Sequence, residues 1–86
     1  MLRMIIADDE FIVRDGLKTI IPWEEFGIEV VAVASNGQEA FDLSLQMQPD
    51  ILFTDIRMPY MDGLEVAIKL KELESPVKII FVSGVQ

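Results

Sequence analysis

Short apolar runs alternate with amphipathic segments from one end of the chain to the other. The apolar runs span Arg3–Ala7, Ile28–Ala34, Ile51–Thr54 and Val77–Val82. Their nearly unbroken hydrophobicity is typical of parallel strands that are buried on both faces. The segments with a helical spacing of apolar residues span Ile12–Ile21, Gly37–Gln48 and Leu64–Leu73. This order predicts a doubly wound α/β fold, with four parallel strands and helices on both faces of the sheet.

Acidic residues directly follow two of the predicted strands. Asp8 and Asp9 come after the first apolar run, and Asp55 comes after the third. Because the carboxyl ends of parallel strands open at one edge of a sheet, we expect the three carboxylates to share a pocket. Like charges held this close repel each other, and a bound cation relieves the repulsion. Carboxylate oxygens suit Mg²⁺, and a carboxylate beside such an ion is a nucleophile suited to phosphoryl groups.

Composition narrows the classes of function. The chain has 86 residues, the size of one small domain, and 51% of them are hydrophobic, which favours a folded core over disorder. Its net charge of −8 argues against binding of nucleic acid or anionic lipid by this segment. Because the chain has neither cysteine nor histidine, a zinc site is not expected. No apolar stretch approaches the ~18 residues of a membrane span, so we expect a cytoplasmic protein with no membrane contact.

Some of the polar residues also have a purely structural interpretation. Asp8 and Asp9 have the chemistry of a helix N-cap pair, and Glu10 has that of a charge in the first helical turn. Ser83, taken alone, is an ordinary serine at the end of a strand. The pairing of these residues with Asp55 is what favours a functional site.

The loop after Asp55 and the segment after the first helix have structural interpretations as well. Asp62 is expected to cap the third helix, with Gly63 allowing a tight turn before it. Packing is the simpler interpretation for four large side chains: Trp23, Phe26, Met58 and Met61. The two aromatic rings among them are expected to cover one end of the core.

These residues together match a known family. They are Asp8-Asp9 after the first strand, Asp55 after the third, Met58-Pro59 with Met61-Asp62-Gly63 behind it, and Ser83 after the fourth. The chain resembles the receiver domain of bacterial two-component response regulators. The resemblance implies a flavodoxin-like sheet of order 2-1-3-4-5. It covers residues 1–86 as a single receiver domain of order 2-1-3-4 that lacks the fifth strand and the last two helices. Ile21–Ile28 also looks like the subgroup with an AraC-type DNA-binding output domain.

The family resemblance implies a role for each matching residue. Asp55 is the phosphoacceptor of a phosphorelay and takes its phosphoryl group from a sensor histidine kinase. Asp9 binds Mg²⁺ directly, Asp8 acts through a bound water, and the backbone carbonyl of Arg57 is a further ligand. Ser83 bonds a phosphoryl oxygen and moves the loop after the fourth strand. Such a regulator of transcription is modified rather than turning over a substrate, so it is not an ordinary enzyme, and it reaches DNA only through its output domain.

The chain departs from the family in two ways. The family's lysine after the fifth strand has no counterpart here, and Tyr60 stands where a small residue is common, so we expect it to narrow access to the pocket. Val77–Val82 is expected to be an apolar edge strand, and such edges pair with other chains. We therefore expect a homodimer, formed either through this strand or by exchange of elements.

Three other interpretations stay open. A phosphatase of the haloacid dehalogenase type needs Asp-x-Asp followed by Gly-Thr, which the residues after Asp55 and after Asp8 do not provide. The chain is alternatively a non-signalling receiver fragment that acts as an acidic dimerisation or interaction module. It is also possible to interpret the 86 residues as a piece of a longer regulator.

Overall fold

Four parallel strands form the sheet at the centre of the protein, in the order β2-β1-β3-β4. The computed structural model describes residues 1–82. The strands are β1 (Leu2–Ala7), β2 (Ile28–Ala34), β3 (Ile51–Asp55) and β4 (Lys78–Val82). Their order and parallel direction confirm the predicted flavodoxin-like arrangement, with strand ends that differ from the predicted ones by one residue at most.

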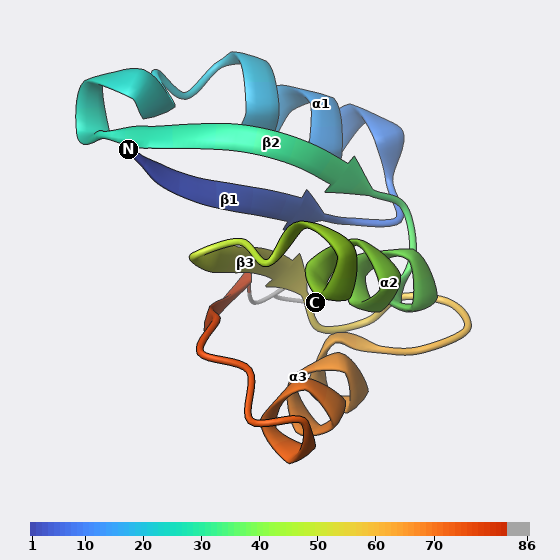
Figure 1. Ribbon diagram of the computed structural model, residues 1–86. Coiled ribbons are helices and arrows are strands. Elements are labelled where there is room, and N and C mark those ends of the chain that lie inside the picture. The colour runs from blue at the N-terminus through green and yellow to red at the C-terminus, as the bar shows by residue number, and fades with distance from the viewer. Residues whose placement is uncertain (83–86) are drawn as a thin grey trace.

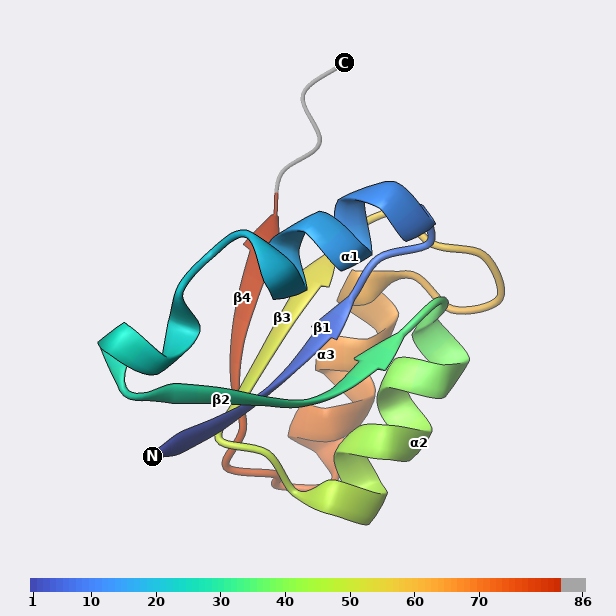
Figure 2. The same ribbon diagram turned by 90° about the horizontal axis from the view of Figure 1, so that it is seen from above.

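Helices cover both faces of this sheet. They are α1 (Phe11–Thr19), the 3-10 helix η1 (Trp23–Phe26), α2 (Gly37–Met47) and α3 (Gly63–Glu72). Helices α1 and η1 lie over one face, and α2 and α3 cover the other (Figures 1 and 2). The doubly wound prediction is therefore confirmed. No helix within residues 1–82 has the length and apolar character that a membrane crossing requires.

The main core lies between the sheet and the α2–α3 layer. Its most buried members, each at most 1% exposed, are Ile5, Ala7, Ala34, Ala40, Leu52, Val66 and Leu70. Helix α1 contributes no buried residue, and its Ile12 side chain is exposed. The α2–α3 layer therefore contributes buried apolar side chains to the core that stabilises the sheet, and α1 contributes none that is fully buried.

The segment after α1 differs from the prediction. The predicted helix over Ile12–Ile21 ends at Thr19, and a separate 3-10 turn follows it. Trp23 anchors this turn, because its Nε1 donates to the Leu17 carbonyl oxygen at 2.7 Å and its ring packs edge-on against Phe53 with centroids 5.8 Å apart. Phe26 is 67% exposed. The packing prediction is therefore confirmed for Trp23, whose ring contacts Phe53, and wrong for Phe26, whose side chain is mostly exposed.

The register between β1 and β3 places Asp8 and Asp55 at the same edge of the sheet. Ala7 of β1 pairs with Thr54 of β3, and both residues are fully or almost fully buried. Asp8 follows Ala7 in the sequence, and Asp55 follows Thr54. Because the strands are parallel and in register, both acidic residues leave the sheet at the same edge.

Candidate metal and phosphoryl site

Three carboxylates converge at this edge of the sheet. Each of Asp8, Asp9 and Asp55 offers one carboxylate oxygen, and these oxygens all lie within 4.8 Å of one another. Asp8 is 4% exposed, Asp55 is half-buried and Asp9 is exposed. The structure thus brings together three of the residues that the sequence singled out, in an acidic cluster that solvent reaches at Asp9 and Asp55.

The electrostatics of the cluster favour a cation. Burial raises the pKa of the Asp8 carboxyl, and the negative charges of Asp55, Asp9 and Glu10 raise it further. The backbone N–H of Glu10 acts in the opposite direction, because it donates to Asp8 Oδ1 at 2.9 Å and stabilises the carboxylate. A cation placed between the three carboxylates would stabilise the charged form of Asp8 and so offset both causes of the increase.

The backbone on either side of Asp8 is held in place. Its N–H donates to the Ala34 carbonyl oxygen of β2 at 3.1 Å, and its own carbonyl oxygen accepts from Arg14 Nη1 at 2.8 Å. The Arg14 guanidinium in turn lies over the Phe11 ring, 5.5 Å from its centroid. These contacts fix the turn between β1 and α1, so the Asp8 carboxylate has little freedom to leave the pocket.

The structure does not support an N-cap role for the Asp8–Asp9 pair. The N-cap residue of α1 is Glu10, and its side chain makes no capping hydrogen bond. Asp8 Oδ1 instead accepts from the N–H of Glu10, two residues later in the sequence. Neither carboxylate therefore makes a capping bond to α1, although one oxygen of Asp8 is engaged by the Glu10 N–H.

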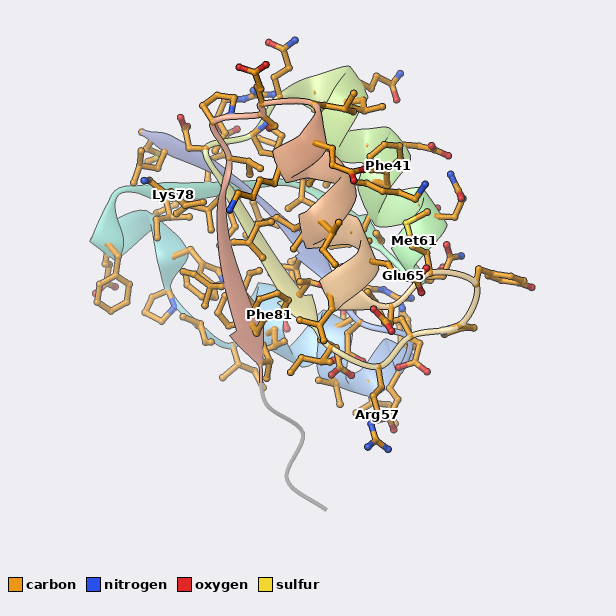
Figure 3. All side chains as sticks on the ribbon, turned by 90° about the horizontal axis from the view of Figure 1, so that it is seen from below. Phe41, Arg57, Met61, Glu65, Lys78 and Phe81 are labelled. Atoms are coloured by element: carbon orange, nitrogen blue, oxygen red, sulfur yellow. The ribbon has the colours of Figure 1, made fainter. Side chains whose placement is uncertain are left out.

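The loop of residues 56–62 joins Asp55 to α3. Asp62 caps α3 as predicted, because its Oδ1 accepts from the Glu65 N–H at 2.8 Å while the Glu65 side chain accepts from the Asp62 N–H. Met58 and Met61 are both 8% exposed and belong to the core, which confirms them as packing residues. Figure 3 shows the Arg57 side chain extending away from the protein, so only the backbone of this residue is available to the pocket side.

Ser83 lies outside the residues that the structure describes. Tyr60 is 87% exposed and lines a shallow groove with Asn36, Glu39 and Leu43 of the α2 region. None of the three clustered carboxylates lines that groove, and the expectation that Tyr60 narrows access to them stays a prediction. The backbone of Tyr60 is in the left-handed region, at φ 70°.

Gly63, which the sequence suggested only as a turn residue, lies directly against the backbone of Asp55. The Gly63 N–H donates to the Ile56 carbonyl oxygen at 2.7 Å. A Cβ at Gly63 would overlap the backbone carbonyl oxygen of Asp55. Gly63 therefore lets α3 begin directly against the backbone of Asp55. The only sequence signal for this is the Asp62-Gly63 pair, which by itself indicates no more than a helix start.

Comparison with known proteins relates this geometry to a family. A family model described as the response regulator receiver domain matches residues 4–86. The transcriptional regulatory protein YesN of Bacillus subtilis is 42% identical over 84 residues, which cover 98% of this chain and 23% of YesN. The chain thus spans about a quarter of the length of that curated relative.

Solved structures agree with the sequence match. The receiver domain of AraT, a response regulator from Geobacillus stearothermophilus, is 42% identical with a TM-score of 0.89, over 96% of this chain and 64% of that one. A two-component transcriptional regulator AraC from Clostridium phytofermentans is 37% identical with a TM-score of 0.86, over 100% and 69%. These names agree with the predicted resemblance to regulators of the AraC type.

A further similar structure contains a metal ion and BeF₃ in addition to protein. It is a complex of CheX, CheY, BeF₃ and Mg²⁺ from Borrelia burgdorferi, matched at 26% identity and a TM-score of 0.85, over 98% of this chain and 63% of that one. The family match, the identities and the shared fold lead to one conclusion. This chain belongs to the receiver domain family of two-component response regulators.

Proposed function

We propose that this receiver accepts a phosphoryl group on Asp55 from a sensor histidine kinase. Mg²⁺ would be held by Asp8, Asp9, Asp55 and the backbone carbonyl of Arg57. The observation that carries the proposal is the convergence of three carboxylate oxygens within 4.8 Å at the ends of two paired parallel strands. Within a two-component system, the resulting acyl phosphate would act as the signal.

The donor set fits Mg²⁺. All three side-chain ligands are carboxylates, and Mg²⁺ prefers such oxygens and keeps several waters. Ligand oxygens at about 2.1 Å from the ion are at most about 4.2 Å apart, so the present spread of 4.8 Å requires only small side-chain rotations. When bound, the ion supplies positive charge that offsets the repulsion between the carboxylates and an incoming phosphoryl group. The Mg²⁺ and BeF₃ in the related complex of CheX and CheY support this proposal.

Asp55 is better placed than Asp8 to act as the nucleophile. Asp8 is almost completely buried, and its Oδ1 already accepts from the Glu10 N–H, whereas Asp55 is half-buried at the open edge. In the proposed step, an Asp55 carboxylate oxygen forms a bond to phosphorus while the P–N bond of a phosphohistidine breaks. The electron pair of that bond leaves with the imidazole, which takes up a proton from solvent.

We also propose that Ser83 hydrogen-bonds the transferred phosphoryl group. Val82 is the register partner of Asp55 across the β3–β4 ladder, and Ser83 follows Val82 in the sequence. A hydroxyl next to that position would detect whether Asp55 is modified. Substitution of Ser83 by alanine would leave phosphorylation possible and weaken the structural response to it.

Acetyl phosphate, a small phosphoryl donor, tests the acceptor role without a kinase. The chain is incubated with acetyl phosphate in Mg²⁺ or in EDTA, and its intact mass is measured. We expect one phosphoryl adduct that requires Mg²⁺ and disappears in Asp55→Asn. The control variant Asp15→Asn carries the same change of charge on the exposed side of α1 and should keep the adduct. The absence of any adduct that depends on Asp55 would overturn the proposal.

A second candidate function is self-association through β4. Among the described residues β4 pairs only with β3, and its Ile80 and Phe81 side chains are 46% and 37% exposed. Free apolar edge strands add strands from other chains. We propose that two copies associate through this edge, and sedimentation velocity over a range of concentrations tests it. Ile80→Lys should shift the chain towards monomer, and a wild-type monomer at all concentrations would refute the idea.

A further inference from the structure

The loop of residues 56–62 carries the Arg57 carbonyl, and its far end lies against helix α2. Met61, near the end of the loop, is buried and belongs to the core between α2 and α3. Figure 3 shows Met61 beside the layer formed by these two helices. The backbone of the loop therefore touches an element that contributes no carboxylate to the pocket.

Gly37, in the first turn of α2, is the point of contact. The carbonyl oxygen of Met61 occupies the place that a Cβ on Gly37 would take, and the Met61 Cβ would lie only 2.9 Å from it. Gly37 is buried, and its backbone belongs to α2, so the requirement is for space rather than for a left-handed conformation. Only a residue without a side chain lets the loop backbone approach the helix this closely.

The first turn of α2 is itself held firmly. The Asn36 side chain accepts from the Glu39 N–H at 2.8 Å, and the Glu39 carboxylate accepts from the Ser35 N–H at 2.6 Å. Directly before this cap, the Ala34 carbonyl oxygen accepts the N–H of Asp8. The start of α2 is thus tied to the backbone of an acidic-pocket residue on one side and to the loop on the other.

We propose that Gly37 is a positioning residue for the metal site. Its contact with Met61 sets how close the loop, and with it the Arg57 carbonyl, lies to the carboxylates of Asp8 and Asp9. This inference rests on the proposed Mg²⁺ site. A side chain at position 37 would push on the loop more than on α2, because the helix start is fixed by two capping bonds, whereas the loop has irregular backbone.

The test is Mg²⁺ affinity in the substitution Gly37→Ala, measured by titration calorimetry with MgCl₂ alone. We expect Kd for Mg²⁺ to rise by about tenfold or more, as is typical when a group that orients metal ligands is disturbed. Gly16→Ala is the matched control, because a Cβ there meets only Ile20 Cδ1, at an ordinary 3.8 Å. This control should bind Mg²⁺ as the wild type does.

Two measurements separate positioning from general destabilisation. Leu70→Ala removes a buried side chain of α3 away from the loop, and its folded fraction should keep wild-type affinity for Mg²⁺. Amide hydrogen exchange of metal-free Gly37→Ala should speed up at the Met61 and Gly63 N–H groups, which donate within the loop, and not in β1. Equal losses of affinity in Gly37→Ala and Leu70→Ala would overturn the inference.

A second variant covers the case in which Gly37→Ala does not fold. Asn36→Ala removes the acceptor that holds the first turn of α2 and adds no atom, and we expect a several-fold weaker Mg²⁺ affinity. Wild-type affinity in either folded variant would refute the role of Gly37. Failure of the wild-type chain to bind Mg²⁺ is a different result, because it would overturn the proposed function together with this inference.

Discussion

Replacement of Asp55 by asparagine is expected to stabilise the metal-free domain. In the absence of a cation, the carboxylates of Asp8, Asp9 and Asp55 repel one another across at most 4.8 Å. Asparagine has nearly the same shape as aspartate and carries no charge. The substitution therefore removes the repulsion on the buried Asp8 carboxylate without leaving a cavity.

The size of this effect follows from the distance. Two unit charges 4.8 Å apart interact with about 3.5 kcal/mol at an effective dielectric constant of about 20, and with about 0.9 kcal/mol in bulk water. Asp55 is half-buried and faces solvent, so we expect an increase of about 1–2 kcal/mol in the free energy of unfolding. For a domain of this size, that corresponds to a rise in Tm of roughly 5–12 °C.

Thermal unfolding in EDTA and in Mg²⁺ is the assay, because Mg²⁺ should raise the Tm of the wild type more than it raises the Tm of the variant. A ligand at 100 times its Kd stabilises the wild type by about 2.7 kcal/mol, and the variant lacks one charged ligand, so it gains less. Asp15→Asn is the control for the change in net charge and should behave like the wild type in both conditions.

Two results would refute this reasoning. A lower Tm for Asp55→Asn in EDTA would show that the three carboxylates do not repel strongly enough to matter. An equal rise in Tm for the two proteins on addition of Mg²⁺ would show that Asp55 is not a ligand of the ion.

Three further predictions concern the pocket and the core. The pKa of Asp8 is raised above its ordinary 3.8 in the folded domain, so the folded state binds this proton more tightly than the unfolded chain does. The free energy of unfolding without metal should therefore fall as the pH rises from 3.8 towards neutrality. Urea unfolding at several pH values should show a flatter pH dependence of this free energy for Asp8→Asn. Asp9→Ala should weaken Mg²⁺ binding more than Asp55→Asn in a titration followed by Trp23 fluorescence, and equal losses would contradict the predicted division of roles. Leu52→Ala empties a site that is 0% exposed and should lower the free energy of unfolding by about 2–5 kcal/mol in denaturant titrations; a loss below about 1 kcal/mol would show that the core collapses around the cavity.

Most of the site could be anticipated because it depends on local pattern and on one rule of topology. Nearly continuous apolar runs are diagnostic of strands buried on both faces, and crossover helices force neighbouring strands to run parallel. Once β1 and β3 are parallel neighbours, the residues that follow them must meet at one edge. The convergence of Asp8, Asp9 and Asp55 is a consequence of that rule and needs no knowledge of side-chain packing.

The two helix starts differ in how well the local sequence predicts their N-cap residues. The Asp62–Glu65 capping box was predictable, since both partners lie within one turn of α3. The start of α1 was ambiguous, because Asp8, Asp9 and Glu10 all have suitable chemistry. The structure resolves it in favour of Glu10, since the contacts of the Asp8 backbone with Ala34 and Arg14 hold Asp8 at the end of the sheet.

The sequence by itself determined the elements and the doubly wound parallel class, because hydrophobic periodicity and parallel topology act through short segments and general rules. The strand order and the roles of the carboxylates came from the family resemblance that the motif residues carry. The tertiary structure alone decided the burial of Asp8, the anchoring of Trp23 against Phe53 and the contact of Gly37 with Met61. Each of these joins segments that are far apart in the chain. Their spacing depends on how the side chains of several elements fill a shared volume, and no pattern along a single segment encodes that.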